Sequence, residues 1–214
     1  MTEEEKIFAG RMFDPRRQEL KDLKHIAHEA CRKYNSMDEY DPARGDVLRA
    51  ILGGAGKSCY FQGPVQFNYG CHTFIGENFF ANFNLMVMDD ARVYIGDNVC
   101  FGPNVSLMAT NHPLPAQERT GLDGEGRTTM AEFAREIHIG SGVWLACNVV
   151  VLDGVTIGEG AVIGAGSVVT KDIPAGWLAF GNPCRPIRPI TAADSRRELI
   201  LEEDLEHFSW NLNG

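Results

Sequence analysis

The sequence predicts a mostly β protein, a parallel β-solenoid with helical segments at both ends. Three observations lead to this prediction: a six-residue repeat, a helical pattern before it, and a polar stretch that interrupts it. They divide the chain into a helical region at 1–58, a solenoid at 59–190 with a loop at about 109–136, and a helical extension at 191–214.

The six-residue repeat runs without a break from Ile139 to Pro174. An aliphatic residue opens every unit, and a small or β-branched residue follows four places later. The openers are Ile139, Leu145, Val151, Ile157, Ile163 and Val169. Six residues turn an α-helix through roughly 600°, so a helix would place successive openers on different faces. Short strands joined by tight turns direct every opener into one narrow core, and this fixed period is typical of a β-solenoid.

A looser array with related spacing runs from Ile75 to Leu107. Its step from Val87 to Ile95 is eight residues, which predicts a small bulge at one corner. The polar, Pro- and Gly-containing stretch at about 109–136 then separates the two arrays. A long loop that leaves a regular solenoid is a typical place for functional residues.

Helix signals dominate residues 1–58, where we expect two or three helices. Thr2 with Glu5 forms a capping box. The Asp-Pro pairs that begin at Asp14 and Asp41 each predict an N-cap followed by proline at the first helical position. The segment GGAGKS at 53–58 lacks the glycine spacing of a phosphate-binding loop, so we interpret it as the hinge into the solenoid.

The C-terminal segment predicts one more helix outside the coil. Thr191 is its expected N-cap, and Leu199, Leu205 and Phe208 would share one face.

Charge and composition exclude several classes of function. The net charge of −9 argues against a nucleic-acid partner, which requires clustered Lys and Arg. The six cysteines are scattered without a CxxC pattern, so we expect free thiols in a reducing, cytoplasmic compartment. The acidic start and the lack of an apolar run of about 18 residues predict neither a signal peptide nor a membrane span.

Three separate parts of the chain carry a family resemblance. The hexads resemble those of hexapeptide-repeat acyltransferases, whose fold is a left-handed parallel β-helix. The run EKIFAGRMFDPRRQEL resembles the N-terminal region of maltose and galactoside O-acetyltransferases, and GNPCRPIRPI resembles their terminal signature. This resemblance implies acetyl transfer from acetyl-CoA to a hydroxyl of a mono- or disaccharide, without a metal. It also implies a homotrimer with active sites between subunits.

The resemblance assigns the catalytic base to His112, in ATNHP at the root of the loop. A neutral imidazole suits proton removal near physiological pH. The group that fixes its tautomer is expected to be either Glu132 or a backbone carbonyl. The acceptor-binding residues implied by matching motifs are Asp14, Asn68, Asn82 and Asp90. Simpler roles stay open for two of them, because Asn82 could satisfy backbone groups at a corner and Asp14 could be only a helix cap.

The resemblance also places coenzyme A along the last coils. The residues expected to contact it are Trp144, Cys147, Ala165, Thr170, Lys171, Arg185 and Arg188. Backbone groups of Cys147 and Ala165 would line the pantetheine groove, and Lys171 would lie at the phosphate end. Cations gathered in the last coil of an acidic protein predict a local anion site. The family commonly has Gly-Ser where this chain has Ala146-Cys147, which would change the shape of the groove.

Alternative functions on the same solenoid remain to be compared. A zinc carbonic anhydrase needs three histidines with a close pair, which His72, His112 and His138 do not offer. A non-catalytic structural subunit would need neither His112 nor the basic end. An acetyltransferase with a non-sugar acceptor is also an alternative, although the N-terminal helical region favours sugar.

Overall fold

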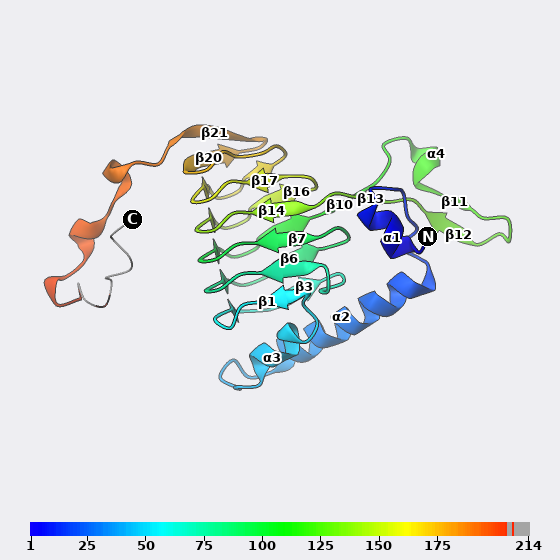
Figure 1. Cartoon of the computed structure of the whole chain (residues 1–214), viewed down its shortest axis with the longest axis horizontal. Coiled ribbons are helices and arrows are strands. Elements are labelled where there is room, and N and C mark those ends of the chain that lie inside the picture. Colours follow the sequence, from blue (N-terminus) through cyan, green and yellow to red (C-terminus); the bar gives the residue numbers. More distant parts are fainter. Residues whose placement is uncertain (205–206, 208–214) are drawn as a thin grey trace.

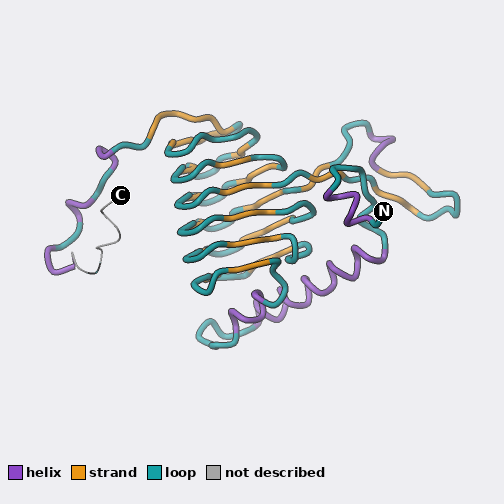
Figure 2. Tube along the Cα trace, in the orientation of Figure 1, coloured by secondary structure: helices purple, strands orange, loops and turns teal. Residues whose placement is uncertain are grey.

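The computed structural model describes residues 1–204 and residue 207. Most of the chain is a stack of coils, with helices below it and an excursion at one side (Figure 1). Short strands alternate with turns around every coil (Figure 2). The fold class predicted from the hexads, a mostly β parallel solenoid, is therefore confirmed.

The strands of the coils form three sheets, one for each face of a prism, and neighbours along the stack pair in parallel except for β20 and β21. Face 1 contains β1 (Gly54–Ala55), β4 (Thr73–Ile75), β7 (Val93–Ile95), β14 (Ile137–Ile139) and β17 (Thr156–Ile157). Face 2 contains β2 (Tyr60–Phe61), β5 (Phe80–Ala81), β8 (Cys100–Phe101), β15 (Trp144–Leu145), β18 (Val162–Ile163), β20 (Trp177–Gly181) and β21 (Cys184–Pro189). Face 3 contains β3 (Val65–Phe67), β6 (Leu85–Met88), β9 (Ser106–Met108), β16 (Val150–Leu152) and β19 (Val168–Val169).

The hexad openers form the core, as predicted. All six are at most 3% exposed. Ile139 pairs with Ile157, which is three hexads further along the chain, so one coil takes three hexads. In the earlier part Ile75 pairs with Ile95, so those coils are two residues longer.

The extra residues gather at one corner of the prism. We call the corner from face 3 to face 1 the loop edge; it consists of residues 68–72, 89–92, 109–136, 153–155 and 170–172. We call the corner from face 2 to face 3 the tight edge; it consists of residues 62–64, 82–84, 102–105, 146–149 and 164–167. The predicted bulge after Val87 lies at the loop edge.

Asparagines make three of the five turns of the tight edge. Asn84, Asn104 and Asn148 have φ of 62°, 60° and 59°, a left-handed conformation that asparagine tolerates better than most residues. Asn84 Nδ2 donates to Asn104 Oδ1 at 2.9 Å, and Asn104 Nδ2 donates to Asn148 Oδ1 at 3.0 Å. This ladder fixes the stacking of three successive coils.

The excursion at the loop edge is an ordered hairpin-like arm. It consists of β10 (Thr110–Asn111), α4 (Ala116–Arg119), β11 (Thr120–Leu122), β12 (Thr128–Met130) and β13 (Phe133–Ala134). β10 pairs antiparallel with β13, and β11 pairs antiparallel with β12. The backbone of Glu132 exchanges two hydrogen bonds with Phe13, at 2.9 and 3.0 Å, so the arm is attached to the N-terminal region.

The N-terminal region contains α1 (Glu3–Phe8), α2 (Gln18–Ser36) and α3 (Arg44–Arg49). The predicted Thr2–Glu5 capping box is present. The predicted caps at Asp14 and Asp41 are wrong, because α2 begins after Arg17 and α3 after Ala43. Each aspartate instead accepts from the backbone two residues on, at 2.9 Å, and so closes a turn before the helix.

Both ends of the stack are covered. At the first coil, α2 packs through Leu20, Ala27 and Cys31, and the Tyr34 hydroxyl donates to the Phe61 carbonyl. The segment interpreted as a hinge already contributes β1 to face 1. At the last coil, β21 turns back and pairs antiparallel with β20.

The predicted C-terminal α-helix is wrong for the described residues. They form three short 3-10 turns, η1 (Ala192–Asp194), η2 (Arg197–Leu199) and η3 (Glu202–Asp204). The Thr191 capping box is present, but Leu199 is 74% exposed, so the segment has no buried face to support a longer helix. Leu205 and Phe208 lie outside the described residues. Within the described part of the chain, no helix has the length and apolarity needed to cross a bilayer.

Candidate active site

His112 directly follows β10, where the arm leaves the loop edge. Its Nδ1 lies 3.0 Å from the Ala131 carbonyl oxygen, and its Nε2 lies 3.6 Å from Glu132 Oε1. A carbonyl oxygen only accepts, so we assign the ring hydrogen to Nδ1 and the lone pair to Nε2. Of the two expected partners, the backbone carbonyl therefore fixes the tautomer, and Glu132 faces the other nitrogen. The imidazole is partly exposed, with 42% of the side chain accessible.

Glu132 is held mostly buried beside His112. Thr110 Oγ1 lies 3.4 Å from Glu132 Oε2, and the backbone pairing with Phe13 fixes the strand. Burial raises the pKa of Glu132, while His112, when it is protonated, and the charge of Lys24 act in the opposite direction. The carboxyl group thus lies close to Nε2 in a partly desolvated position.

Asn68 and Asp90 lie on consecutive coils of the loop edge and bind each other. Asn68 Nδ2 donates to the two carboxylate oxygens of Asp90 at 3.2 and 3.1 Å. Asp90 is 1% exposed. Burial, followed by the charge of Glu132, raises the pKa of Asp90 to about 7, although Lys24 and Asn68 oppose the shift. These two predicted acceptor residues therefore belong to the same edge as His112.

Tyr69 is a residue of this edge that the sequence analysis missed. Its side chain is buried, and its hydroxyl lies close to Asp90 but makes no hydrogen bond of acceptable geometry with the described residues. Burial raises its pKa, and the neighbouring charges of Asp90 and Glu132 raise it further. Lys24 Nζ lies 5.4 Å from the ring centroid. Its hydroxyl is thus buried near two carboxyl groups of the loop edge, and its place next to Asn68 was the only sign of this in the sequence.

His72 was also missed as part of this edge. Its Nδ1 lies 2.9 Å from the carbonyl oxygen of Asp89 and 3.0 Å from that of Asp90. Its Nε2 lies 3.0 Å from Glu4 Oε1. Burial alone would lower its pKa, but the interactions with Cys71 and Glu4 outweigh burial and raise the pKa to about 9. The side chain thus links α1 to the backbone of Asp90.

Asp14 lies at the junction between the N-terminal region and the arm. It lines a cavity of about 370 Å³ together with residues of α2, the segment before it, and the β11–β12 hairpin. Its backbone N–H donates to Glu3 Oε2 at 2.8 Å. Asp14 therefore lies next to the arm that carries Glu132.

A second group of predicted residues lies at the tight edge, away from His112. Asn82, Cys147 and Ala165 occupy this corner on different coils. Asn82 Oδ1 accepts a hydrogen bond from the Phe83 backbone N–H at 2.8 Å, so Asn82 does satisfy a backbone group at this corner. Trp144 is 50% exposed on face 2, next to the same corner. Within one chain, Asn82 and the Cys147 region therefore face a different direction from His112.

The predicted phosphate-binding residues differ in their surroundings. Thr170 and Lys171 are exposed on the loop edge of the last coil, and Lys171 makes no ion pair with the described residues. Arg185 is exposed on β21. Arg188 donates from Nη1 to Asp194 Oδ2 at 2.8 Å, and Nη2 also contacts this carboxylate. Lys171 and Arg185 therefore form no ion pair with the described residues, whereas Arg188 is paired with Asp194.

Comparison with known proteins agrees with this architecture. Residues 136–171 match the family described as bacterial transferase hexapeptide (six repeats), and residues 6–56 match the maltose acetyltransferase hexapeptide capping motif. The galactoside O-acetyltransferase of Escherichia coli is 38% identical over 191 residues, which cover 89% of this chain and 90% of that protein.

Two solved structures are similar over nearly the same range. A galactoside acetyltransferase in complex with coenzyme A has a TM-score of 0.83 and 38% identity, covering 91% of this chain and 94% of that one. A maltose O-acetyltransferase from Clostridium difficile has a TM-score of 0.82 and 38% identity, and the match covers 89% of this chain and 98% of that one.

The parallel solenoid with its hexads and its arm at the loop edge defines a hexapeptide-repeat acyltransferase. The N-terminal capping motif and the relatives narrow the class. The chain belongs to the maltose and galactoside O-acetyltransferase family.

Proposed function

We propose that this protein transfers an acetyl group from acetyl-CoA directly to a hydroxyl of a mono- or disaccharide, with His112 as the general base. The observation that carries the proposal is the tautomer of His112. Its Nδ1–H is held by the Ala131 carbonyl, and Nε2 is directed toward the partly exposed space beside Glu132. A neutral imidazole with a free Nε2 lone pair is the form that accepts a proton.

His112 Nε2 takes the proton of the acceptor hydroxyl as its oxygen bonds to the thioester carbonyl carbon. The carbon–sulfur bond then breaks, and His112 returns the proton to the departing thiolate. Glu132, near Nε2, stabilises the imidazolium that exists between these steps. Protons and electrons balance without a further reactant.

Asn68 and Asp90 are the proposed acceptor ligands at the loop edge, with Asp14 at the mouth of the site. Their proximity to Glu132 supports this assignment: the charge of Glu132 acts on Asp90 and that of Asp14 acts on Glu132. Buried, hydrogen-bonded carboxyl and amide groups discriminate strongly between hydroxyl-bearing ligands and analogues that lack the hydroxyl.

We propose that coenzyme A lies between the loop edge of one subunit and the tight edge of the next, in a homotrimer. The separation of the two residue groups supports this arrangement, because His112 and Asn82 occupy different corners of one prism. Lys171 and Arg185 would contact phosphate, and Cys147 and Ala165 would line the pantetheine arm. Closed cyclic symmetry is the usual arrangement of identical chains.

The first experiment measures thiol release from acetyl-CoA with glucose, maltose, galactosides and a non-sugar amine as acceptors. We expect sugar-dependent release that falls about 10²–10⁴-fold in turnover for His112→Ala. His138→Ala is the matched control, because His138 is an exposed histidine of face 1 that stacks on Tyr94.

Full activity of His112→Ala would refute the base assignment. A folded wild-type protein that releases thiol only with the amine would refute the sugar acceptor. A folded wild type with no release for any acceptor would refute the proposed reaction.

A further inference from the structure

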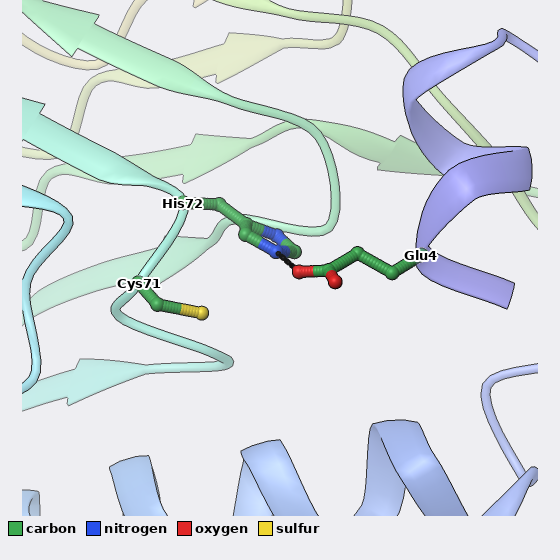
Figure 3. A group of neighbouring side chains, drawn as sticks. All are labelled: Glu4, Cys71 and His72. Carbon is green, nitrogen blue, oxygen red and sulfur yellow. Dashed lines mark hydrogen bonds and ion pairs between the residues drawn. The ribbon is translucent and has the colours of Figure 1, made fainter. Parts of the chain in front are cut away.

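A cluster of three metal-ligating side chains lies outside the residues assigned to acetyl transfer. Glu4 comes from α1, and Cys71 and His72 come from the loop edge. Their ligand atoms, a carboxylate oxygen, a thiol sulfur and an imidazole nitrogen, all lie within 4.8 Å of one another. Figure 3 shows the three side chains directed toward a common space from two separate elements. Among the described residues, this is the only group of three such ligands.

The hydrogen bonds of His72 select the nitrogen that would bind a metal. Nδ1 faces the carbonyl oxygens of Asp89 and Asp90 at 2.9 and 3.0 Å, so it carries a hydrogen. Nε2 is therefore the ligand atom, and it lies 3.0 Å from Glu4 Oε1. Metal-bound histidines are usually oriented in this way, with the other ring nitrogen donating to a carbonyl or carboxylate.

The surroundings of the cluster also have the features of a metal-binding site. His72 is 3% exposed, and its ring centroid lies 4.9 Å from that of Phe8 and 5.1 Å from that of Tyr69. These aromatic rings limit the access of water to the imidazole. Glu4 is 44% exposed, which leaves a path from solvent to the ligand atoms. A satisfied second shell and an entry path are the features expected of a real metal site.

We propose that Glu4, Cys71 and His72 bind one divalent ion of the zinc type, with the fourth position open to water. Thiolate, imidazole and carboxylate are ligands of Zn²⁺ and Co²⁺, whereas Mg²⁺ and Ca²⁺ prefer oxygen alone. The Cys71 thiol proton and the proton that His72 Nε2 shares with Glu4 are both released to solvent as the metal binds.

The bound ion would connect α1 to the loop edge. Two ligands belong to the segment 68–72 and the third belongs to α1, so the ion joins elements far apart in the sequence. His72 also holds the backbone of Asp90. The site lies beside the acceptor residues but takes no part in the acetyl transfer proposed above, so either proposal can fail alone.

The test is a titration of the full chain, without a polyhistidine tag, with Co²⁺ under reducing conditions. Thiolate bound to Co²⁺ produces a charge-transfer absorption in the near ultraviolet. We expect this band to saturate at one equivalent, to be absent in Cys71→Ser, and to need at least about tenfold more Co²⁺ in Glu4→Gln. Cys100→Ser, at an exposed cysteine of β8, should behave as wild type.

A second measurement distinguishes the loss of metal binding from misfolding of a variant. Zn²⁺ should raise the melting temperature of the wild type and of Cys100→Ser, and leave that of Cys71→Ser unchanged. No near-ultraviolet band in the wild type, or a band that persists in Cys71→Ser, would overturn the proposal. So would an equal Zn²⁺ effect on the melting temperatures of Cys71→Ser and Cys100→Ser.

Discussion

Two buried tyrosines at the base of the solenoid have opposite hydrogen-bonding states. The Tyr34 hydroxyl donates to the Phe61 carbonyl, whereas the Tyr69 hydroxyl makes no hydrogen bond of acceptable geometry with the described residues. Removing a satisfied hydroxyl loses a hydrogen bond, but removing an orphan hydroxyl relieves a desolvation cost.

We therefore predict opposite effects of two matched substitutions on stability. Tyr34→Phe should lower the free energy of unfolding by about 1–3 kcal/mol, because it leaves the buried Phe61 carbonyl without its hydrogen-bond donor. Tyr69→Phe should leave the free energy of unfolding unchanged or raise it by about 1 kcal/mol. Urea unfolding measures both, and a loss at Tyr69 equal to that at Tyr34 would contradict the assignment of an orphan group.

Asp90 should make the stability of the protein depend on pH. Its pKa is about 7 in the folded protein against an ordinary value of 3.8. Because the folded value is the higher one, its stabilising contribution is complete below about pH 4 and is lost as the pH rises through about 7. Wild type should therefore lose up to a few kcal/mol relative to Asp90→Asn over this range.

Urea unfolding at several pH values, with a chelator present, measures this difference. Asp38→Asn, at an exposed position of the turn after α2, is the control and should give the wild-type profile. Parallel profiles for wild type and Asp90→Asn would show that burial of Asp90 has no such effect.

The site could be predicted from the sequence only where its residues lie in local motifs. His112, Asn68 and Asp90 follow strands of the repeat, and the structure places all three at the loop edge. The contact between His72 and Glu4 spans 68 residues and depends on how α1 docks. No local pattern encodes that docking, so both Glu4 and the role of His72 were missed.

At the scale of elements, the hexads were predictable because each opener has one physical task. The opener must point into the core at every sixth residue, and a shift of one residue in the strand would turn its side chain to the surface. The corners follow weaker rules: asparagine at the tight edge adopts the left-handed turn, but the length of the loop edge varies from coil to coil. The repeat therefore predicted the strands, and the structure was needed to show that one edge collects the insertions.

Helix boundaries were less predictable than strands. An aspartate before a proline can cap a helix or close a turn just before it, and here both pairs do the latter. The predicted C-terminal helix was wrong for another reason. A short helix is stable only when one face is buried, and the described residues of this segment have no buried face.

At the scale of the molecule, the proposed trimer would bury apolar side chains that lie exposed near the tight edge. Phe83, Met86 and Trp144 are 49%, 41% and 50% exposed. Exposed apolar residues gathered on one surface are typical of an interface. The same edge carries the second group of predicted site residues, so assembly and activity should depend on one surface.

We predict a solution mass three times the 23.6 kDa of the chain. Phe83→Glu should reduce the mass toward that of the single chain and remove acetyl transfer, because a buried unpaired charge opposes assembly. Tyr40→Glu, at an 86% exposed position between α2 and α3, should change neither. Light scattering of the three proteins is the measurement, and a monomeric wild type would refute the trimer.

The covered ends of the stack determine the length of the solenoid. Nothing in a repeat of parallel coils limits its own growth, because the last strand of each face offers the same unpaired backbone as the one before it. The helix α2 packs on face 3 at one end, and at the other end β21, which runs against the direction of every other strand of face 2, closes that face. In polymer terms, the chain itself supplies a terminating segment at each growing end. A protein whose backbone resembles one segment of a fibre thus remains a discrete particle, and any association is left to its side faces.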